Sequence, residues 1–330
     1  MMRKHLLVLA GILTAGTGCD NVEWGEFRVE LKPPPPVERA ASVEVEPTQN
    51  PMGPENQRGP LLLAGVRDGE RADFVLVGEV LTEALASFPD PRFEEDETRL
   101  TEVASIGTEL TLFSEGVRVG RMVTEEVSET TSYCGRRPVL SGVVELVPSA
   151  ANAERLLAMP ATDAEGRGYE PYREVSHVYA QRVATLAMAQ DGIREFGATW
   201  PTQGVLDARD HLQAFQLRNA PGEAIAATFM FEDELVVGPP GPRAYALFVI
   251  GEGSGEEYDR SYSWYREVDT EGKGAPRYFD HLDWDGDGTD EILLDVFGAS
   301  RRWFAALSQR DGAWARSFQD DCGSGSTGQE

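Results

Sequence analysis

The strongest indication of chemistry in this sequence is a run of nine residues near its C-terminal end. Residues 283–291 are Asp-Trp-Asp-Gly-Asp-Gly-Thr-Asp-Glu, with carboxylates at the first, third and fifth positions, a glycine at the sixth, and acids again at the eighth and ninth. Acidic side chains this close together repel one another strongly unless a cation lies among them. Because Ca²⁺ prefers six to eight oxygen ligands at roughly 2.3–2.6 Å, the run predicts a calcium-binding loop.

The run resembles the calcium loops of FG-GAP and VCBS-type repeats, in which Asp-apolar-Asp/Asn-x-Asp-Gly-x-x-Asp forms the connection of a β-hairpin. The resemblance extends over residues 278–300. It implies that the ion is bound by the side chains of Asp283, Asp285 and Asp287 and by the backbone carbonyl of Thr289. Glu291 stands where the family usually has Asp, and Asp290 offers a further acid. One of these two acids is therefore expected to complete the coordination shell.

Two other interpretations of the run exist. An EF-hand shares Asp-x-Asp-x-Asp-Gly but needs Glu at its twelfth position, where this sequence has Leu294. The run could also be an acidic turn without an ion. The apolar residues 292–294 favour a buried strand after the loop, with Trp284 pointing into the same sheet. We therefore expect a structural Ca²⁺ on one blade-like sheet, and not a full propeller, because a propeller of such repeats would show several of these loops.

The N-terminal residues have the features of an export signal. Two basic residues precede an apolar stretch, 6–13, that is too short to span a membrane, and small residues lead to Cys19. This end resembles the lipobox of bacterial lipoproteins, although Gly16 replaces the usual Leu, Val or Ile. The resemblance implies that residues 1–18 are a signal peptide and that Cys19 carries a lipid. The expected location is the periplasmic or cell-surface face of a membrane; ordinary secretion is the alternative.

Residues 19–59 are expected to form a tether. Four consecutive prolines, 33–36, favour polyproline II geometry, and the stretch has too little apolar content to fold alone. The formal net charge of the chain is −26, and removal of residues 1–18 leaves 28 basic residues against 56 acidic ones, which gives −28. Such a chain is repelled by nucleic acid. The expected partners are instead a membrane, through the lipid anchor, and a protein or polysaccharide ligand.

Two cysteines remain once Cys19 is assigned to a lipid. Cys134 and Cys322 form an even pair in a compartment that permits disulfides. A bridge between them would stabilise the fold by on the order of 5 kcal/mol at most in the chain-entropy model. Two unpaired thiols are the alternative interpretation.

Residues 60–150 are predicted to be rich in β-strands. Apolar and β-branched runs predict strands at 61–64, 74–77, 109–113, 117–123 and 139–147. Residues 114–116, Ser-Glu-Gly, predict a hairpin connection. Residues 80–85 are predicted to form one or two helical turns, and the acidic residues 93–98 a solvated loop.

Residues 151–220 change to helical spacing. Apolar residues three or four apart predict an amphipathic helix over 176–193, and Gly197 predicts its end. Two shorter helices are expected on either side of it, over 152–159 and 207–215. This part of the chain is therefore predicted to be a helical segment.

Residues 221–322 return to strand-like patterns. Turn residues separate predicted strands at 224–231, 245–250, 262–268, 278–284, 292–297, 303–307 and 314–318. The tail 323–330 is expected to be disordered. The sequence thus predicts an α+β fold that is predominantly antiparallel β, with a central helical segment and one blade-like sheet that carries the calcium loop.

A search for catalytic motifs finds none in this sequence. His177, His211 and His281 lack metal-binding spacing, and no Gly-x-Ser-x-Gly elbow or phosphate-binding glycine loop occurs. His281 lies two residues before the acidic run, but we expect it on a strand face because calcium prefers oxygen ligands. Pairs of carboxylates carry no information in a chain with 56 acids.

The function expected from these patterns is a binding or envelope-associated role without catalysis. A sugar- or peptide-binding surface could be lined by the aromatic residues Trp200, Trp264, Trp303 and Trp314 with Tyr258, Tyr262 and Tyr265. Aromatic residues in strands nevertheless belong more often to the core. The alternative is a secreted hydrolase that acts on polysaccharide or peptide. A deep cleft with two convergent acids of shifted pKa would favour the hydrolase.

Overall fold

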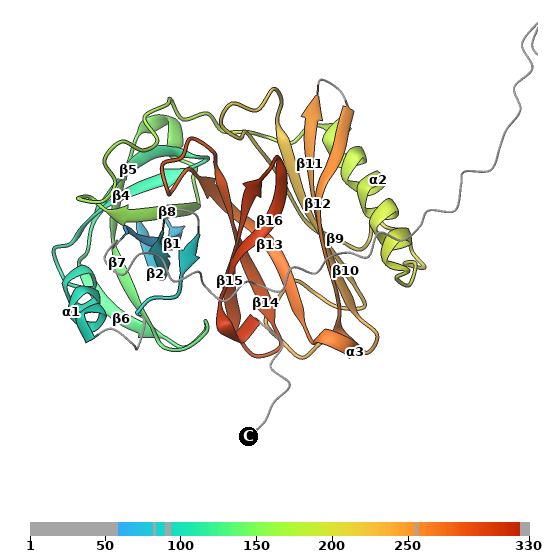
Figure 1. The fold of residues 1–330 in the computed structure, drawn as a ribbon, viewed down its shortest axis with the longest axis horizontal. Coiled ribbons are helices and arrows are strands. Elements are labelled where there is room, and N and C mark those ends of the chain that lie inside the picture. Colours follow the sequence, from blue (N-terminus) through green and yellow to red (C-terminus); the bar gives the residue numbers. More distant parts are fainter. Residues whose placement is uncertain (1–58, 82–83, 90–93, 255–256, 324–330) are drawn as a thin grey trace, which may run out of the picture. The chain divides into compact units, whose positions relative to one another are not determined.

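The computed structural model describes residues 59–81, 84–89, 94–254 and 257–323 (Figure 1). The predicted signal peptide with Cys19, the tether apart from Gly59, and the tail after Gly323 lie outside the described residues. In the part of the chain that the structure describes, no helix combines the length and the apolar composition needed to cross a membrane.

The N-terminal part of the described chain is an antiparallel barrel. Its sheet has eight strands: β1 (Leu61–Asp68), β2 (Arg71–Val80), β3 (Leu85–Ala86), β4 (Glu109–Ser114), β5 (Val117–Val123), β6 (Glu126–Thr130), β7 (Arg137–Leu146) and β8 (Arg155–Pro160). The strand order is β3-β2-β1-β8-β4-β5-β7-β6, and an additional pairing of β2 with β7 closes six of the strands into a ring. Closure leaves those six strands without a free edge.

Both faces of the barrel wall are apolar, which explains its continuous apolar runs. Leu61 and Leu63 point into the barrel, whereas Leu62 and Ala64 belong to the core on the outside of the wall. Successive side chains of a strand point to opposite faces, so a strand buried on both sides needs no polar alternation. Helix α1 (Glu94–Val103) and the short 3₁₀ turn η1 (Pro148–Ala150) pack against the same interior.

The C-terminal part consists of two four-stranded antiparallel meanders. One contains β9 (Arg209–Phe215), β10 (Ala224–Phe231), β11 (Tyr245–Ser254) and β12 (Glu257–Glu267). The other contains β13 (Gly274–Leu282), β14 (Glu291–Gly298), β15 (Arg302–Arg310) and β16 (Ala313–Gln319). The remaining elements are helices α2 (Tyr179–Phe196) and α3 (Val268–Glu271) and the turn η2 (Asp321–Gly323).

The layers follow one another as barrel, β13–β16, β9–β12 and α2 (Figure 1). Strand β13 contributes to two cores. Phe279 packs with barrel residues, and Tyr278 packs with the β9–β12 sheet. The β13–β16 sheet is therefore covered on both faces by neighbouring layers.

The predicted fold class is confirmed, since the chain is mostly antiparallel sheet with few helices and no closed propeller. The principal helix is also confirmed: it begins at Tyr179, three residues later than predicted, and ends where Gly197 adopts a left-handed conformation with φ 65°. Trp264, Trp303 and Trp314 are buried, as expected of core residues, but Trp200 is 44% exposed and the expectation is wrong for it.

Four local predictions are wrong. The expected helices over 152–159 and 207–215 are strands β8 and β9. Val80 ends β2 and Leu85 begins β3, and residues 94–98 of the expected acidic loop belong to α1. Strand β8 misleads because its residues 156–160 are buried on both faces, and a short apolar run with no alternation does not distinguish a strand from a helix.

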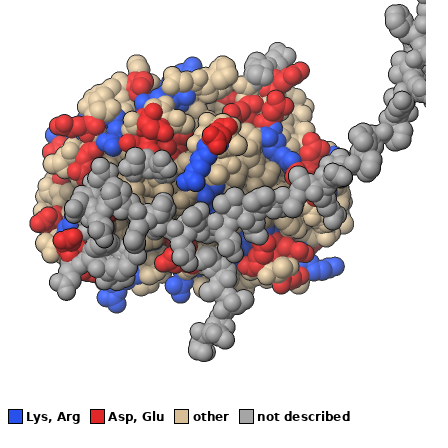
Figure 2. Space-filling model, in the orientation of Figure 1, with Lys and Arg blue, Asp and Glu red and all other residues tan. Residues whose placement is uncertain are grey.

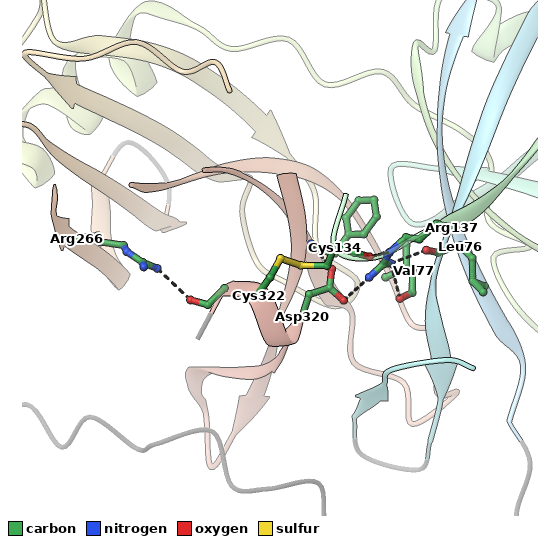
Figure 3. The surroundings of a disulfide bond; sticks show 9 residues. Leu76, Val77, Cys134, Arg137, Arg266, Asp320 and Cys322 are labelled. Atoms are coloured by element: carbon green, nitrogen blue, oxygen red, sulfur yellow. Dashed lines mark hydrogen bonds and ion pairs between the residues drawn. A yellow bond between two sulfur atoms is a disulfide. The ribbon is translucent and has the colours of Figure 1, made fainter. Parts of the chain in front are cut away.

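A disulfide joins the barrel to the end of the chain (Figure 3). Cys134 precedes β7 and Cys322 follows β16, and their Cα atoms lie 5.9 Å apart. Beside the bridge, Arg137 donates to Asp320 Oδ1 at 2.6 Å and to the carbonyl of Leu76 at 2.6 Å (Figure 3). The bridge and this ion pair tie the barrel wall to the β13–β16 sheet.

Candidate metal centre and acidic pocket

The acidic run forms the connection between β13 and β14, as the hairpin resemblance implied. Its side chains are fixed by the backbone of the run itself. Asp283 accepts the N–H groups of Gly286 at 2.8 Å and Gly288 at 3.1 Å, Asp285 that of Asp287 at 3.0 Å, and Asp287 that of Thr289 at 2.7 Å. Gly286 and Gly288 have φ of 82° and 94°, a left-handed conformation that favours glycine.

Three carboxylates converge in this loop. One oxygen from each of Asp283, Asp285 and Asp287 lies within 4.8 Å of the others, so the triad could hold a metal ion. Burial raises the pKa of Asp285 to about 6 and also raises the pKa of Asp283. Both shifts show that negative charge is costly at this position unless a cation compensates it.

The two acids that end the run point in different directions. Glu291 is buried, and its Oε2 accepts the N–H of Trp284 at 3.2 Å. Burial and, after it, the charge of Asp285 raise the pKa of Glu291 to about 9, so this carboxyl lies near enough to the triad to interact with its charge. Asp290 instead accepts the backbone N–H of Arg218 at 2.5 Å. The indole of Trp284 points into the core, with 1% of its surface exposed.

Arginines from two other layers contact the loop. Arg218, between β9 and β10, donates to Asp283 Oδ2 at 3.1 Å. Arg167, in the segment that follows β8, donates to the carbonyl of Trp284 at 3.0 Å and to that of Asp163 at 2.8 Å. The loop therefore lies where the barrel segment, the β9–β10 connection and the β13–β14 hairpin meet.

His281 is a strand-face residue and not a member of the metal group. Its ring is fully buried; Nδ1 lies 2.7 Å from the Tyr278 hydroxyl and Nε2 lies 3.0 Å from the carbonyl of Gln216. A carbonyl can only accept, so Nε2 carries the proton and Nδ1 accepts from the hydroxyl. Burial lowers the pKa of His281, which keeps the ring neutral.

A pocket of about 510 Å³ lies against β13. It is lined by the β4–β5 turn, by the segments before β8 and α2, and by β9 and β13. Two acids lie at its base: Glu115 in the β4–β5 turn and Asp280 in β13. The N–H of Glu115 donates to Asp280 Oδ1 at 3.0 Å, and Gly116 donates to the carbonyl of His281 at 3.1 Å.

The acid pair is poorly compensated by the protein. Asp280 is 3% exposed, and its Oδ2 has no hydrogen-bond partner among the described residues; neither does Glu115 Oε2. Burial raises the pKa of Asp280 to about 7. Burial and the charge of Asp280 raise the pKa of Glu115 well above its usual range. Both carboxyl groups are therefore protonated more readily than ordinary surface acids.

Arg155 and Tyr172 complete the polar wall of this pocket. The guanidinium of Arg155 lies 3.4 Å from His211 Nε2 and donates to Gln213 at 3.3 Å. Burial, followed by the charge of Arg155, lowers the pKa of His211 to about 3, so this histidine stays neutral beside the guanidinium. Burial raises the pKa of Tyr172 to about 12.

The pocket residues were not predicted from the sequence. Glu115 and Asp280 are separated by 165 positions, and each is one of 56 acids in the chain. The single sequence signal at Asp280 is a carboxylate directly after the apolar residues Tyr278 and Phe279 of a predicted strand, a position that is costly without a compensating interaction. His177 lines the pocket and His211 supports Arg155, so two of the three histidines in the described part of the chain lie at this site.

Comparison with known proteins leaves both sites to be interpreted on their own geometry. No protein-family model, no curated protein and no solved structure matches this chain.

Proposed function

We propose that this chain is an exported, lipid-anchored binding protein whose β13–β14 loop holds a structural Ca²⁺. The observation that carries the metal assignment is the convergence of Asp283, Asp285 and Asp287, whose oxygens lie within 4.8 Å of one another. The anchoring part of the proposal rests on the N-terminal sequence and on Cys19.

The donor set favours calcium. All of the converging groups are carboxylates, and hard oxygen donors suit Ca²⁺ or Mg²⁺ better than zinc or copper. Glu291 is the acid that completes the shell, because its carboxyl lies near enough to the triad to interact with its charge, whereas Asp290 is engaged with Arg218. A larger ion with flexible coordination fits a loop that offers several carboxylates better than Mg²⁺, which keeps most of its waters.

The ion would act on stability and not on substrates. The loop is contacted by Arg218 and Arg167 from two other layers, so compensation of its charge would hold three parts of the fold together. Extracellular calcium is often near millimolar, and a site with a dissociation constant of roughly 10⁻⁴ M would be filled there.

Thermal melting tests the metal assignment. We expect the wild-type protein to melt higher in 1 mM CaCl₂ than in EGTA by roughly 3–6 °C, since ligand at about ten times its dissociation constant adds about 1.4 kcal/mol. D285N/D287N should lose this rise. The matched control D191N/D269N, which removes two exposed acids elsewhere, should keep it. Identical wild-type melting in calcium and EGTA would refute the metal site.

Fractionation tests the anchor. When the full chain is expressed in a bacterium, the wild type should pellet with membranes and incorporate labelled palmitate, and C19S should do neither. Palmitate labelling of C19S, or wild-type protein found only in the soluble fraction, would contradict the lipid anchor.

One observation favours the second candidate, a secreted hydrolase. Glu115 and Asp280 are two neighbouring acids in a pocket, and burial raises the pKa of both, as is common for catalytic acids. Release of reducing sugar or of peptide from generic polysaccharide or casein substrates, abolished by E115Q and kept in the surface variant E145Q, would establish this function. Absence of both activities leaves the binding role.

A further inference from the structure

We propose that the pocket between the β4–β5 turn and β13 binds a small organic ligand through a protonated amine, with Glu115 and Asp280 as its acceptors. The inference names the ligand class of the proposed binding role and therefore rests on it. It does not depend on the metal loop, because none of the residues that converge on the ion lines this pocket.

The pair of Glu115 and Asp280 has hydrogen-bonding capacity that the described residues do not satisfy. Asp280 Oδ1 accepts two backbone N–H groups, from Glu115 at 3.0 Å and from His281 at 2.8 Å. Asp280 Oδ2 and Glu115 Oε2 are buried and accept none within the described part of the chain. Buried polar atoms without partners are uncommon. A nearby positive charge favours the ionised form of a carboxyl group, and an ionised carboxylate can only accept. A cationic ligand with N–H donors would therefore satisfy both oxygens.

The lining of the pocket carries an excess of negative charge. The pocket lining carries four acids, Glu115, Glu154, Glu174 and Asp280, against one arginine, Arg155. Arg155 makes no ion pair within 4.0 Å among the described residues. Its guanidinium is instead positioned by His211 at 3.4 Å and by Gln213 at 3.3 Å. The excess of negative charge favours a cation over a neutral polyol or an anion.

The acid pair suits an organic cation better than a metal ion. The only group of three ligating side chains found within the described residues is the Asp283 triad, so this pair has no third carboxylate or histidine close enough to form a metal shell. An ammonium group needs fewer acceptors, and it offers three N–H donors to the two unpartnered oxygens. Tyr172 lines the same pocket and supplies an aromatic face, which favours cationic ligands.

Three matched probes test the inference: tyramine, its alcohol analogue tyrosol, and 3-(4-hydroxyphenyl)propionate. They share the phenol and the two-carbon spacer and differ in the terminal ammonium, hydroxyl or carboxylate. Binding to the full chain is measured by calorimetry and by ligand-observed NMR, in EGTA and in CaCl₂. We expect tyramine to bind at least about ten-fold more tightly than the other two, since loss of a charge-assisted hydrogen bond costs roughly this factor.

Variants locate the site. E115Q and D280N keep the side-chain shapes and should each weaken tyramine binding about ten-fold. The control E145Q removes an exposed acid of β7 that pairs with Arg121, and it should bind tyramine as the wild type does. Each variant is first melted, and if D280N unfolds early, E115Q alone decides the result.

Three outcomes would overturn the inference. Equal binding of tyramine and tyrosol would indicate a site for neutral hydroxylated ligands, tighter binding of the propionate would indicate that Arg155 dominates, and no binding of any probe would leave the pocket without this role. The calcium-dependent melting of the same samples reports on the metal loop, so failure of the amine site is distinguishable from failure of the proposed calcium site.

Discussion

The metal loop and the acid pair lie on either side of His281, yet they compensate their carboxylates in different ways. In the loop, Asp283, Asp285 and Asp287 each accept backbone N–H groups from the loop itself. In the pocket, one oxygen of Asp280 is satisfied by two backbone N–H groups and the other by none.

The two sites also differ in the number of acids that converge. The loop gathers three carboxylates within 4.8 Å, which is the arrangement of a multidentate ion site. The pocket offers two carboxyl groups from distant parts of the chain beside a guanidinium. We infer that the two clusters of acids bind two kinds of cation. The loop, with three carboxylates, binds a metal ion, and the pocket, with two carboxyl groups, binds an amine.

Elsewhere on the surface the acids are dispersed. Figure 2 shows Asp and Glu spread over the visible face with Lys and Arg among them, and not gathered in one patch. The net charge of −26 therefore does not by itself point to either site. Variants that separate the loop from the pair are needed to test the comparison.

The largest effect is expected for G116A, which should disturb the pair and spare the loop. Gly116 has φ +74°, and a Cβ there would lie 3.0 Å from Nε2 of the buried His281 ring. The left-handed strain and the clash together should lower the free energy of unfolding by about 3 kcal/mol and weaken tyramine binding. Urea denaturation measures the loss.

Gly69 provides the control for this variant. It has φ +63° in another hairpin turn, but a Cβ there would meet nothing within 4 Å. G69A should therefore lose about 1 kcal/mol. The rise in melting temperature with calcium should persist in both variants. Equal losses of unfolding free energy in G69A and G116A would show that the contact with His281 does not affect stability.

D280N should stabilise the protein at high pH. The pKa of Asp280 is about 7 in the folded protein and about 3.9 when unfolded. The folded state therefore binds the proton more tightly, and stability is lost as pH rises from about 4 through 7. Asn does not titrate, so at pH 8 in EGTA we expect D280N to exceed the wild type by on the order of 2 kcal/mol, reduced by its unpartnered amide.

The pH dependence provides the check. The advantage of D280N should shrink as the pH is lowered and disappear near pH 4, where Asp280 is protonated in both states. D191N, which removes an exposed acid, should show no such trend. A D280N protein that is less stable than the wild type at pH 8 would show that the protein itself compensates the Asp280 carboxylate. That result would remove the basis for amine binding at the acid pair.

E291Q should reverse its effect with calcium. In EGTA the substitution removes a buried acid that interacts with the charges of three other acids, and we expect a gain of about 1–2 kcal/mol in unfolding free energy. In CaCl₂ it removes a ligand charge, and we expect a loss of about the same size. Denaturation in the two buffers measures both. A change of the same sign in both would mean that Glu291 does not belong to the coordination shell.

The sequence revealed the loop because its chemistry is local. Asp283, Asp285 and Asp287 are two residues apart, and the glycines between and after them carry the left-handed turns that bring their oxygens together. Turn residues likewise mark most of the strands of both meanders. These features depend on neighbours in the sequence, so they could be predicted.

The barrel and the pocket could not be predicted because they depend on distant contacts. Closure requires β2 to pair with β7, with Val75 opposite Val139. Glu115 meets Asp280 only after the β4–β5 hairpin of the barrel packs on β13. The apolar run of β8 is misleading for a related reason, since burial on both faces removes the alternation that marks a strand.

The smallest effect is expected for Arg218, the residue that competes with a cation in the loop. Its guanidinium donates to Asp283 Oδ2 at 3.1 Å, and Asp283 is one of the three carboxylates that converge in the loop. R218M should therefore bind calcium about 3–10-fold more tightly, because it removes a positive charge next to the ion. In EGTA it should lose about 1 kcal/mol, since the buried Asp283 is left with less compensation.

Calcium titration by calorimetry measures this change, with R121M as the control. Arg121 pairs with Glu145 on the exposed surface of the barrel, so its loss alters the net charge equally without touching the loop. If R121M tightens calcium binding as much as R218M does, the gain comes from net charge alone. If R218M binds calcium more weakly than the wild type, Arg218 orients the Asp283 carboxylate for the ion and does not compete with it.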